Sequence, residues 1–179
     1  MGRTATDTHE ILQQYAALPF RVRDGALLVL LVTTRGTGRW IIPKGNPEPG
    51  LKPHEVAKQE AFEEAGVRGR VRRKRLSTFE FVKSPDDGIG PGSPCTVDVY
   101  ALAVDQELDD WPEKGMRLRE WMTPGQAAMR VSEPGLIELF LRVVQEDLGL
   151  VRHWLDATRL PAVAQSPSQP AMERSCPTT

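Results

Sequence analysis

A glycine-led loop that runs straight into an acidic helix is the feature that most constrains this chain. The loop begins at Gly45, and the helix predicted over 53–65 carries Glu60, Glu63 and Glu64. Because each helical residue turns by about 100°, glutamates at i, i+3 and i+4 share one arc of the surface. Like charges at that spacing repel, and a hard divalent cation, which prefers oxygen ligands, would neutralise them. For the glutamates alone, a solvated acidic helix face is the plain alternative.

Strand-like and helical segments alternate along the rest of the chain. Residues 1–16 predict a loose arm or a short helix, and 20–23 an edge strand. The apolar run 26–32 follows an Asp-Gly turn signal and predicts a central strand. Further β-like runs lie at 39–42, 67–82, 96–104 and 117–122, and helices are predicted at 123–129 and from 132 onward. This mixture predicts an α+β fold, an α/β/α sandwich, and not a doubly wound parallel sheet.

The length of 179 residues predicts one domain of ordinary size. The Pro/Ser/Thr-rich stretch near the C-terminus predicts a disordered tail. We therefore expect an N-terminal arm at 1–17, a single folded domain at 18–157 and a tail at 158–179.

Composition excludes several classes of function. A net charge of −1 gives no general attraction to nucleic acid, and the arginines of 68–75 fit the solvent face of a strand. No apolar run approaches the roughly 20 residues that span a bilayer. Cys95 and Cys176 are too far apart to indicate a disulfide framework, which favours the cytoplasm. The histidines do not cluster as a metal site would require. Neither nucleic acid nor membrane is expected as a partner, and a homodimer through the strand faces is left open.

The segment from Gly45 to Val67 resembles the signature of the Nudix family, whose members hydrolyse nucleoside diphosphates linked to another moiety and related pyrophosphates. That signature is G-x5-E-x7-R-E-U-x-E-E-x-G-U, with U a bulky aliphatic residue. Here the spacing from Gly45 to Gly66 is kept over 22 positions. The resemblance implies a Nudix-type α/β/α sandwich with a mixed central sheet. It also implies a pyrophosphohydrolase, and the full spacing outweighs the solvated-face alternative.

Three positions depart from this signature. Leu51 stands where the pattern has its first glutamate, Gln59 where it has arginine, and Ala61 is smaller than the usual aliphatic residue. Losing the glutamate and the arginine together leaves no unpaired charge behind. Our hypothesis is that Leu51 packs and Gln59 makes a neutral contact in place of an ion pair, so that the glutamates facing the metal stay intact.

Site residues follow from the resemblance, position by position. It implies Glu60 and Glu64 as metal ligands, joined by the backbone carbonyl of Lys44, and Glu63 as a further ligand or the general base. Family members differ on which glutamate takes the proton, so the catalytic set is Glu60, Glu63 and Glu64. The expected cofactor is Mg²⁺, and Mn²⁺ suits the same oxygen ligands.

Within the family, the chain is most similar to the diphosphoinositol polyphosphate and diadenosine polyphosphate hydrolases. That subgroup grips polyphosphate with basic residues, which implies a substrate-binding set of Arg21, Arg35, Arg39 and Arg117. Other cations of the subgroup are missing: the loop 84–94 holds aspartates, and Glu133 stands where a lysine is expected. Fewer cations favour a dinucleoside polyphosphate, or another nucleoside diphosphate derivative, over inositol pyrophosphates.

A second function of a different class follows from the altered signature. A Nudix-fold module could bind a nucleotide or sugar-nucleotide as a sensor without efficient cleavage. Degenerate modules are expected to lose one of the three glutamates of the helix, and this chain keeps them all. The hydrolase is therefore the preferred reading.

Overall fold

The computed structural model describes residues 11–83 and 92–145. All of them belong to the first of two units, Met1–Leu148, and the second unit, Gly149–Thr179, contains none of them. The predicted tail at 158–179 and most of the loop 84–94 thus lie outside the described residues. The division into arm, domain and tail stays a prediction.

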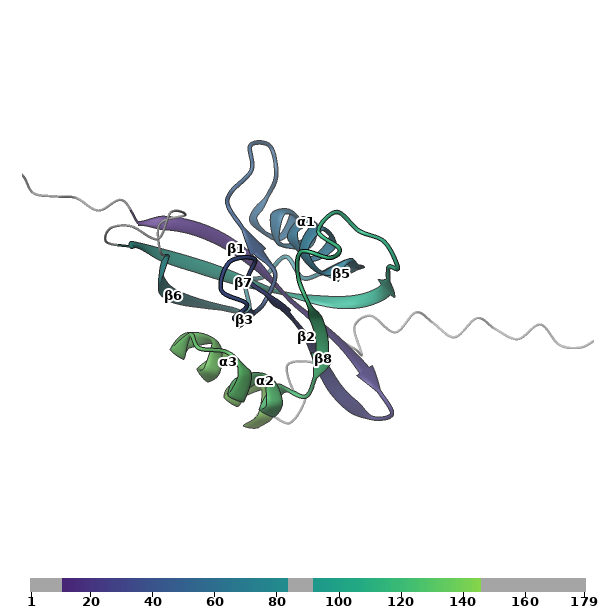
Figure 1. The fold of residues 1–179 in the computed structure, drawn as a ribbon. Helices are drawn as coiled ribbons and strands as arrows, with labels where there is room; N and C mark the ends of the chain where they lie inside the picture. Colours follow the sequence, from purple (N-terminus) through teal and green to yellow (C-terminus); the bar gives the residue numbers. More distant parts are fainter. Residues whose placement is uncertain (1–10, 84–91, 146–179) are drawn as a thin grey trace, which may run out of the picture. The chain divides into compact units, whose positions relative to one another are not determined.

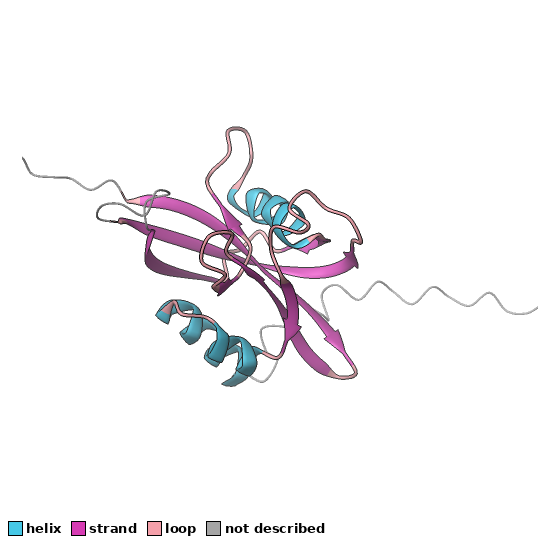
Figure 2. Cartoon of the chain, viewed as in Figure 1, coloured by secondary structure: helices cyan, strands magenta, loops and turns pink. Residues whose placement is uncertain are grey.

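Eight strands and three helices make up the described part of the chain (Figures 1 and 2). In chain order they are β1 (Leu12–Arg23), β2 (Ala26–Thr33), β3 (Trp40–Ile41), β4 (Lys44–Gly45), α1 (Pro53–Ala65), β5 (Val67–Val71), β6 (Ser77–Lys83), β7 (Ser93–Glu107), β8 (Arg119–Met122), α2 (Pro124–Arg130) and α3 (Pro134–Gln145).

The strands form one mixed sheet with the central order β3-β2-β1-β7-β5. Strands β1 and β7 pair in parallel, from Leu12 opposite Cys95 to Phe20 opposite Ala103, whereas β2 and β4 both run antiparallel to β1. β6 also pairs with β7, and β8 with β2. The predicted α+β fold with a mixed sheet is confirmed.

The N-terminal prediction is wrong for the residues that the structure describes there. Residues 12–16, expected in a loose arm or a short helix, belong to β1, and 20–23 end that same strand and are no edge. β1 lies between β2 and β7, and its residues 16–20 are buried without alternation. A strand covered on both faces has a continuous apolar pattern, which does not show the two-residue period of a half-exposed strand.

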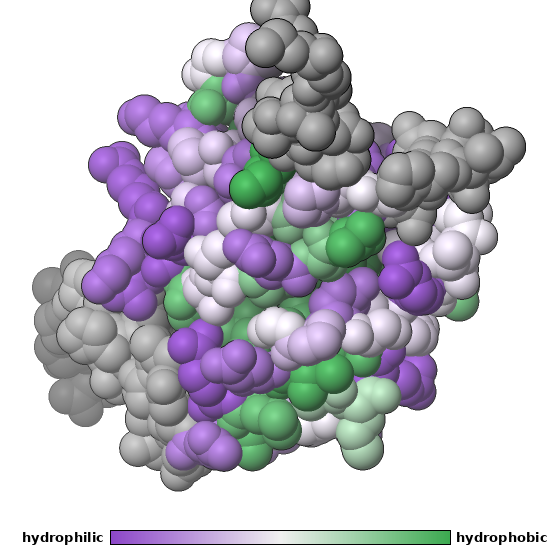
Figure 3. Space-filling model, turned by 90° about the vertical axis from the view of Figure 1, so that its left-hand side faces the viewer, coloured by the Kyte–Doolittle hydropathy of each residue, from purple (hydrophilic) through white to green (hydrophobic). Residues whose placement is uncertain are grey.

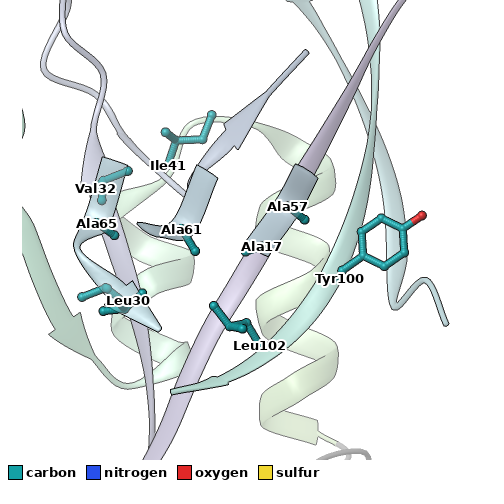
Figure 4. Packing of buried hydrophobic residues seen from close by; sticks show 10 residues of the cluster. Ala17, Leu30, Val32, Ile41, Ala57, Ala61, Ala65, Tyr100 and Leu102 are labelled. Carbon is teal, nitrogen blue, oxygen red and sulfur yellow. The ribbon is translucent and has the colours of Figure 1, made fainter. Parts of the chain in front are cut away.

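Helices cover both faces of the sheet (Figure 1). α1 packs against β1, β4 and β5, while α2 packs on α3 and β2, and α3 on β6. Ala57, Ala61 and Ala65 follow each other at four-residue spacing and are fully buried against the sheet. Figure 4 shows these alanines beside residues of the neighbouring strands, among them Ala17, Leu30, Val32 and Leu102. The small residue at position 61 therefore lets the acidic helix lie close to the strands.

Local signals define both ends of α1. Pro53 takes the first turn, where its missing N–H costs nothing, and the Glu55 carboxylate accepts the Lys52 backbone N–H at 2.8 Å. Gly66 ends the helix at a φ of 63°, a conformation that glycine adopts easily. A Cβ at Gly66 would lie 2.5 Å from the Trp111 ring, so a larger residue has no room. The glutamates are thus carried by a helix with well-defined limits.

Arg119 holds the C-terminal end of α1. Its guanidinium donates to the carbonyls of Ala65 at 2.7 Å and Leu108 at 2.9 Å, and lies 4.0 Å from the Trp111 ring centroid. A cation at a helix C-terminus also interacts favourably with the helix dipole. Arg119 therefore ties the helix to the segment that follows β7.

Replacing Arg119 by methionine should lower the free energy of unfolding by about 2–3 kcal/mol, because its charge-assisted hydrogen bonds to these carbonyls are lost. Urea unfolding followed by circular dichroism measures this change. Arg73→Met, at an exposed position, is the control and should stay within about 0.5 kcal/mol of the parent chain. Equal changes in both variants would contradict a capping role for Arg119.

The surface is mixed in character. Figure 3 shows hydrophobic patches separated by hydrophilic residues on one face of the molecule. Leu118, Met129 and Val144 are among the large apolar side chains that stay exposed. Within the described ranges, no helix is long and apolar enough to cross a membrane. The homodimer left open by the sequence stays open.

Candidate active site

Gly45 and Glu60 are in direct contact. β4 is anchored on β1 by the register of Gly45 with Tyr15, and by the Ala17 N–H, which donates to the Pro43 carbonyl at 3.0 Å. A Cβ built on Gly45 would lie only 1.7 Å from the Glu60 Oε1 atom. The glycine at the start of the signature therefore makes the space in which the Glu60 carboxylate lies.

Glu64 lies deeper than Glu60 and is 6% exposed. One carboxylate oxygen accepts the Lys44 backbone N–H at 3.1 Å, and the other accepts from the Arg117 guanidinium. Burial raises the pKa of Glu64, and the Arg117 charge and the Lys44 N–H oppose this rise. The three residues come from α1, β4 and the segment before β8, so only the fold brings them together.

Gln59, a neutral side chain, connects the loop to the helix through hydrogen bonds to two carboxylates. Its Nε2 atom donates to Glu63 at 2.9 Å and to Glu48 at 3.2 Å. This supports the neutral contact of our hypothesis. Leu51, which the hypothesis expects to pack, is 38% exposed and so is covered only in part. The loop is therefore held through Glu48, a residue that the signature does not specify.

Glu113 is a site residue that sequence reasoning missed. Its backbone N–H donates to the Glu63 carbonyl at 3.1 Å, and its carboxylate contacts the guanidiniums of Arg117 and Arg35. No local pattern marks Glu113, which lies in a loop 49 residues beyond Glu64 in the printed sequence. Only its approach to α1 reveals that a fourth carboxylate borders the three of the helix.

The four predicted substrate arginines divide into separate groups. Arg35 and Arg117 both contact Glu113, with N–O distances of 3.5 Å and 2.5 Å. Arg39 lies 3.6 Å from the buried Glu133, and Arg21 pairs with Glu107 at 2.8 Å and stacks over Trp121. The structure thus brings Arg117 to Glu64 of the helix and both Arg35 and Arg117 to Glu113, and gives Arg39 and Arg21 other carboxylate partners.

The side chain of Lys44 points to different partners than its backbone does. Its Nζ atom donates to Gln14 Oε1 at 2.8 Å and lies 4.9 Å from the Phe81 ring centroid. Burial lowers the pKa of Lys44, although the Glu64 charge opposes this. The buried ammonium anchors β4 to β1, which leaves the backbone of Lys44 in place beside Glu64.

Glu60 is the most strongly perturbed acid of the site. Burial, together with the charges of Glu64, Glu63, Glu48 and Glu113, raises the pKa of Glu60 to about 7. Several carboxylates held this close cannot all ionise at the ordinary pKa of glutamate. The site therefore has a surplus of negative charge that a cation would relieve.

This raised pKa predicts how the stability of the metal-free protein depends on pH. Between about pH 4.5 and pH 7 the folded chain keeps a proton on Glu60 that the unfolded chain has lost, so stability falls as pH rises through this window. We expect the free energy of unfolding of the parent chain to fall by roughly 1–2 kcal/mol relative to Glu60→Gln between about pH 5 and pH 8, because water at this half-buried group reduces the full effect.

Urea unfolding in EDTA at several pH values measures this difference. Glu138→Gln, exposed on α3, is the control and should run parallel to the parent chain. If the difference in the free energy of unfolding between the parent chain and Glu60→Gln does not change with pH, the raised pKa of Glu60 is contradicted.

The carboxylate oxygens of the site are the type of ligand that a divalent cation such as Mg²⁺ prefers. Glu60, Glu64 and Glu113 offer carboxylate oxygens: Glu60 lies against Gly45, Glu64 against the Lys44 backbone, and Glu113 against Arg117. Among the described residues, no three His, Cys, Asp or Glu side chains already converge as a metal cluster. Glu64 and Glu113 are instead held by Arg117. The predicted ligand roles of Lys44, Glu60 and Glu64 stay predictions.

Comparison with known proteins places the chain in a family. The NUDIX domain matches residues 12–143. Nudix hydrolase 16, mitochondrial, of Arabidopsis thaliana is 34% identical over 146 residues, which cover 73% of this chain and 81% of the relative. Against Nudix hydrolase 12, mitochondrial, of the same plant, the identity is 34%, and the match spans 68% of this chain but only 62% of that protein. Human diphosphoinositol polyphosphate phosphohydrolase 3-alpha is 33% identical over 64% of this chain and 66% of its own length.

Solved structures agree on the fold. The crystal structure of C. elegans Ap4A hydrolase has a TM-score of 0.58 at 17% identity and covers 78% of this chain and all of that one. The NUDIX domain of Shewanella oneidensis NrtR, solved with ADP ribose, has a TM-score of 0.57 at 15% identity, over 78% of this chain and 89% of that one. Two plant relatives are named mitochondrial, and the predicted cytoplasmic location stays a prediction. The chain belongs to the NUDIX family, and the enzyme class expected from its sequence, a Nudix pyrophosphohydrolase, is confirmed.

Proposed function

We propose that the protein is a Mg²⁺-dependent hydrolase that cleaves a pyrophosphate bond in a nucleoside diphosphate derivative, with a dinucleoside polyphosphate as the preferred substrate. One observation carries this proposal. The Glu60 carboxylate lies against Gly45, and Glu113 reaches the same helix, where its backbone N–H donates to the Glu63 carbonyl and its carboxylate shares Arg117 with Glu64. Names among the relatives, which include diphosphoinositol polyphosphate phosphohydrolase and Ap4A hydrolase, support a polyphosphate substrate.

The residues of the chain take the following roles in this proposal. Glu60 and Glu64, with the Lys44 carbonyl, hold the cation, which when bound neutralises phosphate oxygens and lowers the pKa of a water ligand. Mn²⁺ could replace Mg²⁺, since both accept oxygen ligands. Glu63 serves as a further ligand or accepts the proton of the attacking water. Arg117 lies between Glu64 and Glu113, and Arg35 lies beside Glu113. Both orient the phosphates in this proposal, because guanidinium forks match phosphate oxygens.

Charge pairing supports a moderately charged substrate. Each predicted substrate arginine already has a carboxylate partner: Glu107 for Arg21, Glu113 for Arg35, Glu133 for Arg39, and Glu64 with Glu113 for Arg117. One oxygen of Glu133 is buried without a hydrogen-bond partner among the described residues. Paired arginines attract a dense cluster of phosphates less strongly than free ones, which disfavours inositol pyrophosphates.

A substrate panel tests the proposal. Diadenosine polyphosphates, ADP-ribose, other nucleoside diphosphate derivatives and inositol pyrophosphates are incubated with the protein and Mg²⁺ or Mn²⁺, and products are separated by ion-exchange chromatography. We expect kcat/KM for diadenosine tetraphosphate to exceed that for an inositol pyrophosphate at least about tenfold, or ~1.4 kcal/mol. The reverse order would contradict the substrate assignment.

The sensor alternative has one specific observation in its favour. A NUDIX domain of similar fold, that of S. oneidensis NrtR, was solved with ADP ribose bound. Tight binding of ADP-ribose without turnover of any panel member would establish this alternative and overturn the hydrolase. Retention of Glu60, Glu63 and Glu64 favours the hydrolase, since simple binding needs none of them.

A further inference from the structure

Arg117 is buried between two of the carboxylates of the candidate metal site. Its side chain is 8% exposed, and its three nitrogens reach three different elements. Nε donates to Glu113 at 2.5 Å, Nη1 to the Thr33 carbonyl at 2.9 Å, and Nη2 to Glu64. The guanidinium therefore neutralises Glu64 and Glu113 together, while Thr33 at the end of β2 fixes its position.

The Glu64 carboxylate cannot bind the Arg117 guanidinium and a divalent cation equally well at the same time. Both oxygens of Glu64 are engaged, one by the Lys44 N–H and one by Arg117. A divalent cation on the Arg117 side of Glu64 would meet a positive charge at contact distance, and this repulsion is strong where water is excluded. Direct coordination by Glu64 and Glu113 therefore requires that Arg117 let go of at least one of them.

We propose that Arg117 is a resident counter-ion of the metal site, which binds Glu64 and Glu113 in the metal-free protein and exchanges them for substrate phosphate when a divalent cation loads. This inference rests on the proposed function, because it takes Glu64 as a metal ligand. Charges stay paired both in the metal-free and in the metal-loaded protein. When the cation loads, it replaces the guanidinium beside the carboxylates, and the guanidinium then binds phosphate.

Two neighbouring arginines do not share this position. Arg35 also contacts Glu113, but its side chain is 64% exposed and its N–O distance is 3.5 Å. Arg119 lies two residues along the same extended segment. Its donors face the backbone carbonyl of Ala65 at the end of α1 and that of Leu108 after β7, and it also lies 3.4 Å from Glu107. Arg35 and Arg119 are therefore matched controls, the first for charge near Glu113 and the second for a partly buried guanidinium.

Binding of Mn²⁺ to variants of the full chain tests the inference. We expect Arg117→Met to bind Mn²⁺ at least about tenfold more tightly than the parent chain, because no resident cation has to be displaced. Arg117→Lys keeps the charge and should stay within about threefold, and Arg35→Met within about twofold, since exposed pairs are weak. The free Mn²⁺ signal in electron paramagnetic resonance gives each dissociation constant without any turnover.

Thermal unfolding supplies a second readout. In EDTA, Arg117→Met should unfold at a lower temperature than the parent chain, since two carboxylates lose their counter-ion. Mn²⁺ should raise the melting temperature of the variant more than that of the parent chain. Weaker or unchanged Mn²⁺ binding by Arg117→Met would overturn the inference, because Arg117 would then position Glu64 for the metal or play no part in its binding.

A measurement on the parent chain covers the case in which Arg117→Met does not fold. The Nε–H signals of the arginines are followed by ¹⁵N nuclear magnetic resonance during a Mg²⁺ titration, with Arg117 assigned from its missing signal in Arg117→Lys. We expect the Arg117 signal to move and the Arg119 signal to stay. An unchanged Arg117 signal while Mg²⁺ binds overturns the exchange alone. No binding of Mg²⁺ or Mn²⁺ by the parent chain overturns the metal-dependent function as well.

Discussion

Glu64→Gln should reduce kcat for diadenosine tetraphosphate at least about 1,000-fold, which corresponds to more than ~4 kcal/mol of transition-state stabilisation. Glutamine has nearly the shape of glutamate, so the helix and its packing should survive. What is lost is the negative charge that the proposal assigns to cation binding. Glu64 is also the carboxylate that joins α1 to the Lys44 backbone and to Arg117.

The measurement is steady-state hydrolysis with saturating Mg²⁺, with circular dichroism to show that the fold is kept. Glu138→Gln, exposed on α3, should retain the parent rate within about twofold. A near-normal rate for Glu64→Gln would refute its proposed role as a metal ligand. If Glu64→Gln loses both its activity and its fold, Glu60→Gln tests the role of the glutamates instead, because Glu60 is less buried and this variant should also be inactive.

Gly45→Ala should reduce kcat by about 100-fold while leaving the fold largely intact, because a displacement of about 1 Å in a catalytic group can cost this much. The added methyl group would lie 1.7 Å from Glu60 Oε1, so the carboxylate has to swing away. That atom is the far end of a flexible side chain, and the loss of stability should be limited to about 1 kcal/mol.

Gly125→Ala is the matched control, since a Cβ there meets nothing within 4 Å. Its rate and stability should stay close to those of the parent chain. Mn²⁺ affinity provides a further readout for Gly45→Ala, which should bind the ion more weakly because Glu60 is displaced. A variant with normal rate and normal Mn²⁺ affinity would show that Gly45 does not serve to place Glu60.

These expectations separate two layers of the site. Gly45, Glu60 and Glu64 act through the local geometry of loop and helix. Glu113 and Arg117 reach the same place from a segment about 50 residues further on. The first layer is expected to set whether the chain hydrolyses at all, and the second how tightly it binds the cation and the phosphates.

The loop and the acidic helix could be predicted from the chain because their causes are local. The helical period of 3.6 residues places Glu60, Glu63 and Glu64 on one arc, Pro53 starts α1, and Gly66 ends it. The predicted helix at 53–65 is confirmed residue for residue. The start of α2 has an equally local cause, since the Thr123 side chain accepts the backbone N–H of Gln126.

The predictions that differ from the structure concern residues whose surroundings are formed by segments distant in the sequence. Residues 12–16 look like an arm because the strand that pairs with them, β7, begins 81 residues after Leu12. Leu51 is expected to pack but stays 38% exposed, and the loop is tied to the helix by the hydrogen bond between Gln59 and Glu48. In both cases the chain carries no local signal, because burial depends on which distant segment covers a residue.

By itself, the sequence determined the family, the α+β class and the helix that carries the acids, since these depend on spacing along the chain. Only the tertiary structure showed that Glu113 borders these acids and that Arg117 lies between Glu64 and Glu113. It also showed that every predicted substrate arginine has an acidic partner. The physical reason is that electrostatic partners are chosen by distance in space, and the sheet brings residues about 50 positions apart into contact.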